Sequence, residues 1–295
     1  MILRKRRHRK AWAPTAAHSG WSESTYAELA WDRSRSAATR WAIAGGVAGA
    51  VGALVAFAPA AWLASAIESA TGQRVLLADA RGTIWSGSAV AVLTAGAGSR
   101  DASALPGRLE WTLGLKGLAA ELRLRHACCI NGNPALQVRP GFGRVQVVLP
   151  PATGWLAQWP AGMLGGLGTP WNTMDLGGAV RLSTPGLTLE TVQGRWRVAG
   201  RADVDLLGVS SRISPLPTLG SYRMSVVGDP GGAGAQLSLT TQEGALQLSG
   251  SGSVGASGLR FRGDAKAAEG QESALNNLLN IIGRRDGARS VISIG

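Results

Sequence analysis

The chain is poor in the side chains that carry most enzyme chemistry. Its 295 residues include three histidines and two cysteines, and His126 is the only histidine beyond residue 18. No G-x-S-x-G, H-E-x-x-H or C-x-x-C pattern occurs, so the sequence offers neither a paired nucleophile and base nor the ligand spacing of a common metal site. We therefore predict that the protein is not an enzyme, with no catalytic, cofactor-binding or metal-binding residues and no small-molecule substrate.

The two cysteines, Cys128 and Cys129, are adjacent in the chain, which excludes a loop-closing disulfide within one molecule. In an oxidising compartment they form a vicinal disulfide, stay as thiols, or pair between chains. His126 lies nearby, but three residues in so short a stretch do not enclose a tetrahedral zinc without a fourth ligand. A structural role is favoured, and a vicinal disulfide between Cys128 and Cys129 is the candidate linkage.

Residues 41–67 contain no Asp, Glu, Lys, Arg or His. A bilayer core about 30 Å thick needs roughly 20 apolar residues in a helix, and this segment exceeds that length. We predict one transmembrane helix over residues 41–67, with the indoles of Trp41 and Trp62 at the two interfaces. Pro59 lies late in this span, where a kink or an early end is tolerated. A cleaved signal peptide is the alternative, but its apolar core is only about 7 to 15 residues long and follows a shorter leader.

The segment before residue 41 is strongly basic, with nine Lys or Arg residues and three acids. Cytoplasmic flanks of membrane helices are enriched in Lys and Arg, so residues 1–40 should be a cytoplasmic tail. We expect this tail to be disordered, with at most a short helix around Glu23 to Arg40. Residues 68–295 should then lie in the periplasm of a bacterial cell. The basic run fits a topology signal and a contact with anionic lipid better than it fits nucleic acid, so no nucleic-acid partner is expected.

The apolar segment carries small residues at helical spacing. Gly45 and Gly49 form a small-xxx-small pair, and Gly52 continues the same face. Such residues let two helix backbones approach closely, so this face is a candidate contact with another membrane helix. The alternative is that a chain rich in Ala and Gly fills any apolar helix with small residues.

Beyond residue 67 the hydrophobic pattern changes to period two, which indicates strands with one apolar face. Glycine accounts for 42 residues and marks many of the turns. We predict a mainly β domain over residues 68–295, built as a curved antiparallel sheet, with one short helix from a Ser273 cap to a stop at Gly283. The alternating segments are 109–113, 122–124, 145–147, 180–182, 187–189, 237–239, 246–248 and 259–261.

Two acidic residues, Asp203 and Asp205, alternate along one of these segments and would share a strand face. There they either bind a cation or pair with Arg201. A solvated strand face is the simpler interpretation.

Four short motifs follow one another along the chain. They are Gly82-Thr83-Ile84-Trp85-Ser86-Gly87, the stretch Leu105 to Trp111, the stretch Pro217 to Tyr222, and the stretch Asn277 to Gly283. In this order they resemble motifs of protein N of the type II secretion system. The resemblance runs from about residue 40 to residue 295, and nothing is carried over to the tail, which is longer than the family's leaders.

The resemblance implies a non-catalytic, single-pass component of the inner membrane of a Gram-negative bacterium. Its partners would be the inner-membrane platform proteins and the outer-membrane secretin, which it would link during export of folded periplasmic proteins. The alternating strands also fit a second hypothesis, an envelope lipid-transfer or lipid-binding sheet anchored in the inner membrane. A periplasmic enzyme is the weakest hypothesis, because no catalytic set is present.

Overall fold

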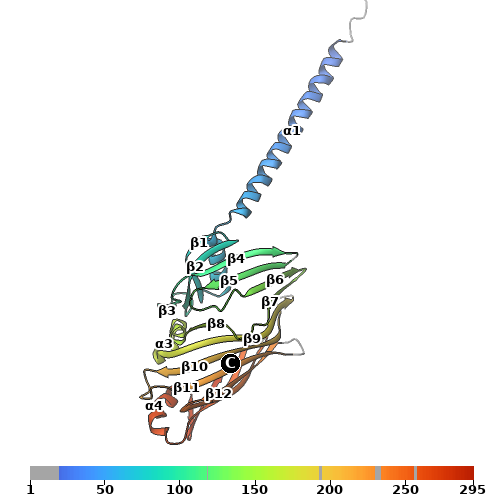
Figure 1. Ribbon diagram of the computed structural model, residues 1–295. Helices are drawn as coiled ribbons and strands as arrows, with labels where there is room; N and C mark the ends of the chain where they lie inside the picture. The colour runs from blue at the N-terminus through green and yellow to red at the C-terminus, as the bar shows by residue number, and fades with distance from the viewer. Residues whose placement is uncertain (1–19, 118, 193–194, 230–233, 256–257) are drawn as a thin grey trace, which may run out of the picture. The chain divides into compact units, whose positions relative to one another are not determined.

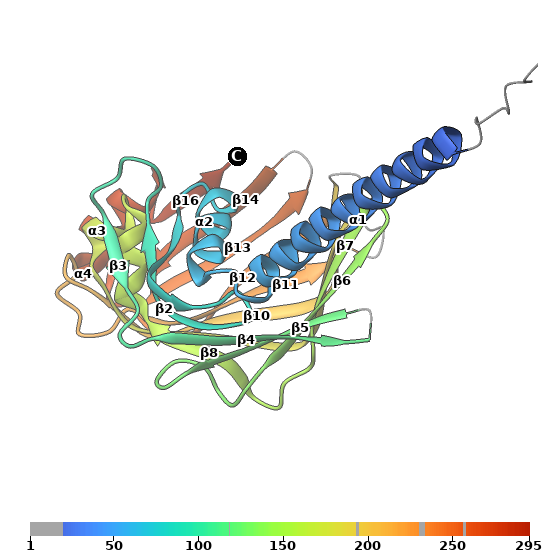
Figure 2. The ribbon, with the colours of Figure 1, turned by 90° about the horizontal axis from the view of Figure 1, so that it is seen from above.

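The computed structural model divides the chain into two units, Met1–Phe57 and Ala58–Gly295. It describes residues 20–117, 119–192, 195–229, 234–255 and 258–295. Figure 1 labels many of the helices and strands, and Figure 2 labels further ones. Residues 1–19, the first half of the predicted disordered tail, lie outside the described residues.

The first unit holds one long helix, α1 (Gly20–Ala56). Its segment Ala38–Ala56 is long and apolar enough to cross a membrane. The helix also includes residues 20–40, where we expected at most a short helix around Glu23 to Arg40. The described part of that tail is therefore helical.

The helical segment predicted over residues 41–67 is interrupted. The first helix ends at Ala56, and α2 (Ala60–Ala70) begins after Pro59, whose backbone is extended. Proline lacks a backbone N–H and disfavours helical geometry in the residue before it, so α1 does not continue. Residues 58–67 belong instead to the second unit, where Ala60 is buried.

The second unit is one antiparallel sheet of sixteen strands. Hydrogen-bonded neighbours follow the order β1-β2-β4-β5-β6-β7-β9-β10-β11-β12-β13-β14-β16-β15, while β3 pairs with β2 and β8 pairs with β9. The strands are β1 (Val75–Gly82), β2 (Ser86–Thr94), β3 (Ala102–Ala104), β4 (Leu109–Lys116), β5 (Ala119–His126), β6 (Ala135–Gly141), β7 (Arg144–Leu149), β8 (Trp155–Pro160), β9 (Leu176–Val192), β10 (Arg195–Ser211), β11 (Gly220–Gly228), β12 (Gly234–Glu243), β13 (Leu246–Gly255), β14 (Gly258–Ala267), β15 (Arg284–Asp286) and β16 (Arg289–Ile294).

Two long strands, β9 and β10, join the two halves of the sheet. The C-terminal part of β9, residues 187–192, pairs with β7, and an N-terminal part, residues 179–183, pairs with β8. On its other side, β10 pairs with β11, and the C-terminal strands follow β11 in the sheet. Figure 2 shows that the sheet is strongly curved, with α2 inside the arc.

The larger core lies under the C-terminal half of the sheet, against the helix α4 (Glu272–Ile282). Leu275, Leu278 and Leu279 of this helix are fully buried. Across the sheet, Tyr222 is buried and its hydroxyl donates to the carbonyl oxygen of Leu246 at 3.0 Å. Burial raises the pKa of this phenol above its ordinary value.

A smaller core lies under the N-terminal strands. It joins Ala60 of α2 to Ala89 of β2 and Trp111 of β4. Trp111 is buried, and its indole N–H donates to the carbonyl oxygen of Ile84 at 3.2 Å. Gly87 lies under this ring, where an added Cβ would come within 2.5 Å of the Trp111 Cζ2 atom. This core ties α2 to the start of the sheet.

The predicted fold class is confirmed: the chain is mainly β, with one antiparallel sheet, one apolar N-terminal helix and one short C-terminal helix. The predicted stop of that last helix at Gly283 agrees with the structure. The helix begins one residue before Ser273, and Gln271 stands at the N-cap position without a side-chain hydrogen bond. Between β8 and β9 the chain forms a 3-10 helix (Ala161–Leu167) and the short α3 (Trp171–Met174).

Candidate interaction surfaces

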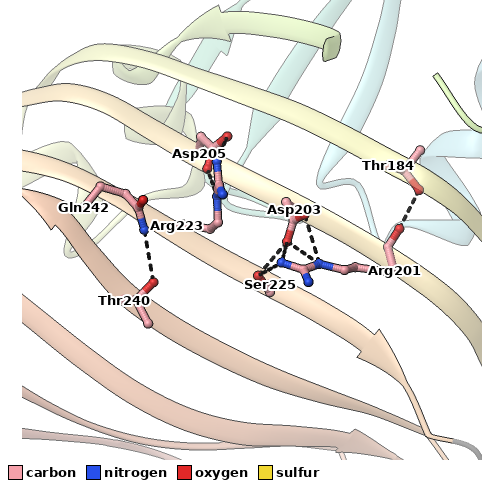
Figure 3. A network of polar contacts seen from close by, with 8 residues as sticks. All are labelled: Thr184, Arg201, Asp203, Asp205, Arg223, Ser225, Thr240 and Gln242. Atoms are coloured by element: carbon pink, nitrogen blue, oxygen red, sulfur yellow. Dashed lines mark hydrogen bonds and ion pairs between the residues drawn. The ribbon is translucent and has the colours of Figure 1, made fainter. Parts of the chain in front are cut away.

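A ladder of polar side chains crosses β10 and β11 (Figure 3). Register places Asp203 opposite Ser225 and Asp205 opposite Arg223. The guanidinium of Arg201 donates from Nε to both Asp203 carboxylate oxygens, at 2.9 and 3.0 Å. Ser225 donates its hydroxyl to the same carboxylate at 2.5 Å.

The second half of the ladder is a two-pronged ion pair. Arg223 donates to Asp205 from Nε at 2.6 Å and from a terminal nitrogen at 3.1 Å. The Asp205 side chain is only 10% exposed, whereas that of Arg223 is 42% exposed. Hydrogen bonding to Asp205 raises the pKa of Arg223 above its usual value.

Both acids singled out from the sequence therefore share one face and are paired with arginine. The pairing of Asp203 with Arg201 is the alternative we left open, and the Asp205–Arg223 pair depends on register that the sequence does not reveal. With both carboxylates engaged by guanidinium groups, this face is better suited to stiffening the sheet than to holding a cation.

The N-terminal edge of the sheet is β1, which among the described strands pairs only with β2. The pairing is regular from Val75 to Ala78 and is interrupted before Arg81. At the interruption Asp79 adopts a positive φ of 49°. The side chains of Arg81 and Arg108 contact its carboxylate and hold the pKa of Asp79 below the usual range. The Thr71 hydroxyl bonds both backbone polar groups of Val75, so residues 76–78 form a short open edge.

The two cysteines are joined in the structure by a disulfide. Cys129 is buried and Cys128 is exposed. The Nδ1 atom of His126 lies 3.3 Å from the Cys128 Sγ, and burial lowers the pKa of His126. These three side chains are close enough to share an ion. With both sulfurs in a disulfide there is no thiolate ligand, so the arrangement fits a structural role.

The candidate contact face on α1 is open. A Cβ built at Gly45, Gly49 or Gly52 has no neighbouring atom within 4 Å among the described residues. The three glycines lie in the segment that is long and apolar enough to span a membrane. Their role in a helix–helix contact stays a prediction.

The fold and these surfaces define a class of protein: a large antiparallel sheet with an open edge, attached to one apolar helix of membrane-spanning length. Residues 73–292, almost the whole sheet unit, match the family model of type II secretion system protein N. The chain therefore belongs to the type II secretion system protein N family, an inner-membrane component of that secretion machinery. No curated protein sequence and no solved structure matches it.

Proposed function

We propose that this protein is a non-catalytic scaffold of the type II secretion system that links the inner-membrane platform to the outer-membrane secretin. The observation that carries the proposal is the family match over residues 73–292, which coincides with the sheet. Family membership implies interaction with other secretion subunits. A sheet with a paired polar ladder and two apolar cores suits a rigid link.

The proposed orientation follows the charge asymmetry of the sequence. Nine basic residues precede the apolar helix, so we place the N-terminus in the cytoplasm and residues 58–295 in the periplasm. The periplasm is an oxidising compartment, in which the Cys128–Cys129 disulfide can persist. On α1, the Gly45, Gly49 and Gly52 face would contact a membrane helix of another platform protein.

The open edge of β1 is the proposed docking place for a partner in the periplasm. Unpaired backbone groups at a strand edge accept a further strand from another chain. The backbone N–H and carbonyl oxygen of Val75 are bonded to the Thr71 hydroxyl. Residues 76–78 therefore offer the edge, and the irregular backbone at Asp79 limits the length of any added strand. A short, specific pairing is favoured over extended edge-to-edge aggregation.

Deletion of the gene, followed by measurement of exoprotein in the culture medium, tests the function. We expect secreted protein to accumulate in the periplasm, and the full-length gene to restore release. A photoreactive amino acid at the exposed Ala78 of β1 should then crosslink a secretion subunit in intact cells. The same group at Arg285 of β15 is the matched control on the opposite edge strand of the sheet.

Normal secretion in the deletion strain, together with altered outer-membrane lipid, would contradict the scaffold and support the lipid-transfer alternative. Mass spectrometry of the purified chain addresses the same alternative, because a lipid carrier should retain bound lipid. Equal crosslinking from Ala78 and Arg285 would contradict the proposal that the β1 edge is the docking place.

A further inference from the structure

We propose that the tips of the β4–β5 and β6–β7 hairpins form a second membrane contact, docking on the anionic lipid surface beside the anchor. The proposal rests on the anchoring of α1 in the inner membrane and adds a contact made by the sheet. It is carried by the exposed side chains at the two tips, their charges, and the point at which the chain enters the sheet.

The two tips present large apolar side chains to solvent. Phe142 stands between two glycines at the β6–β7 turn and is 109% exposed, while Leu115 of β4 is 77% exposed. Because β5 pairs with β6, the two hairpins are neighbours in the sheet. Phe142 and Leu115 are exposed on neighbouring hairpins, and covering both with an apolar surface would remove their apolar area from water.

Cationic side chains surround these apolar tips. Lys116 and Arg144 are largely exposed, and Arg139 lies three residues before Phe142. Their ion pairs within the protein are long: Lys116 to Glu121 is 3.9 Å and Arg144 to Glu190 is 3.8 Å. Such exposed pairs are weak, so the cations remain available to phosphate groups. Apolar tips with a basic collar suit an anionic lipid surface.

The chain enters the sheet at the same end. Ala58 accepts a hydrogen bond from the Ile84 N–H at 2.9 Å, and Pro59 bridges to Thr83 in the turn between β1 and β2. Every second turn of an antiparallel sheet lies at the same end of the strands. The β1–β2 turn and the tips of the β4–β5 and β6–β7 hairpins therefore lie at one end of the strands. Ala58 is two residues beyond the end of α1 at Ala56, so only a short stretch of chain separates it from the membrane-spanning segment.

The length of β4 carries its tip beyond the β1–β2 turn, where the chain enters the sheet. The Leu113 N–H donates to the carbonyl oxygen of Trp85, which places Leu113 level with the β1–β2 turn. From there β4 continues to Lys116, about 10 Å further at roughly 3.3 Å per residue. Trp62, in the first turn of α2 at the same end, is more than half exposed, as an indole at a membrane interface would be.

A lipid-quenching experiment on the full chain tests the contact. In a background where Cys128 and Cys129 are replaced by serine, Phe142→Cys carries an environment-sensitive fluorophore in nanodiscs of phosphatidylethanolamine and phosphatidylglycerol. Lipids with a nitroxide on the acyl chain should quench this label several-fold more than one at Ser99→Cys. Ser99 is exposed in the loop after β2, at the opposite end of the sheet.

The charge dependence has a matched control. Replacing the three tip cations by glutamine, or replacing phosphatidylglycerol by phosphatidylcholine, should lower quenching at position 142, whereas an equal loss of charge at the opposite end should not. The tip variant is Lys116→Gln, Arg139→Gln, Arg144→Gln, and the control is Lys266→Gln, Arg284→Gln, Arg285→Gln.

Three outcomes would overturn the inference. Equal, weak quenching at both labels in a chain that resists alkaline extraction and supports secretion removes the docking but leaves the proposed function standing. Shielding of the Phe142 label only after other secretion subunits are added assigns the tips to a protein partner. Release of the chain by alkaline extraction removes the anchor and this contact together.

Discussion

Truncating Leu278 tests whether α4 closes the larger core. The Leu278 side chain is 1% exposed and packs among Leu275, Leu279 and the C-terminal strands. The helix is also tied to the sheet by Ser290, whose buried hydroxyl donates to the Leu279 carbonyl oxygen at 2.6 Å. With its neighbours held in this way, the site has little freedom to collapse, and Leu278→Ala should cost about 3 kcal/mol of unfolding free energy.

That cost converts into a measurable change in melting temperature. For a unit of this size, each kcal/mol lowers Tm by roughly 2 to 4 °C, so we expect a drop of about 6 to 12 °C. Thermal unfolding of the full chain in detergent, followed by tryptophan fluorescence, measures it. Ile281→Ala on the same helix is the control, because Ile281 is 45% exposed and should change stability by less than about 0.5 kcal/mol. Equal Tm values for the two variants would refute the packing of α4.

Three further predictions concern the N-terminal core, the polar ladder and the anchor. Gly87→Ala should destabilise the sheet by roughly 1 to 3 kcal/mol, because the new methyl group would overlap the buried indole of Trp111, and Tm measures the loss. A double-mutant cycle of Asp205→Asn and Arg223→Gln should give a coupling of about 1 kcal/mol by urea unfolding, since Arg223 is partly solvated. Gly49→Leu should weaken association of α1 with platform helices in a membrane two-hybrid assay.

Each of these changes has a control within the chain. Gly114→Ala adds the same methyl group where no atom lies within 4 Å, so a matching loss there would contradict the clash at Gly87. A coupling energy near zero between Asp205 and Arg223 would contradict the predicted contribution of this ion pair to stability. Val47→Leu, on another face of α1, should leave association unchanged, and an equal effect would argue against the glycine face.

Local pattern was sufficient to predict several elements. The alternation Leu109 to Leu113 became β4, because a strand with one buried face needs period-two hydrophobicity whatever it pairs with. The short helix predicted between Ser273 and Gly283 likewise became α4, which buries Leu275, Leu278 and Leu279. Pro59 allowed a kink or an early end of the apolar segment, but a run without charges does not show where a membrane segment ends and a packed helix begins.

The candidate surfaces were less predictable, because they depend on pairing between distant strands. Asp205 meets Arg223 and Gly87 meets Trp111 only in the register that the folded sheet adopts. A shift of one residue would send every side chain of a strand to the other face. No local signal in the sequence specifies those registers.

The sequence by itself determined the apolar helix, the charge asymmetry around it, the β class and the scarcity of catalytic side chains, because these depend on composition and short-range periodicity. The tertiary structure alone decided that Pro59 separates α1 from a helix that packs on the sheet. It also brought the entry of the chain and the exposed Phe142 and Leu115 to one end of the sheet. Those outcomes arise from long-range strand pairing, whose energy is spread over many contacts that no single segment encodes.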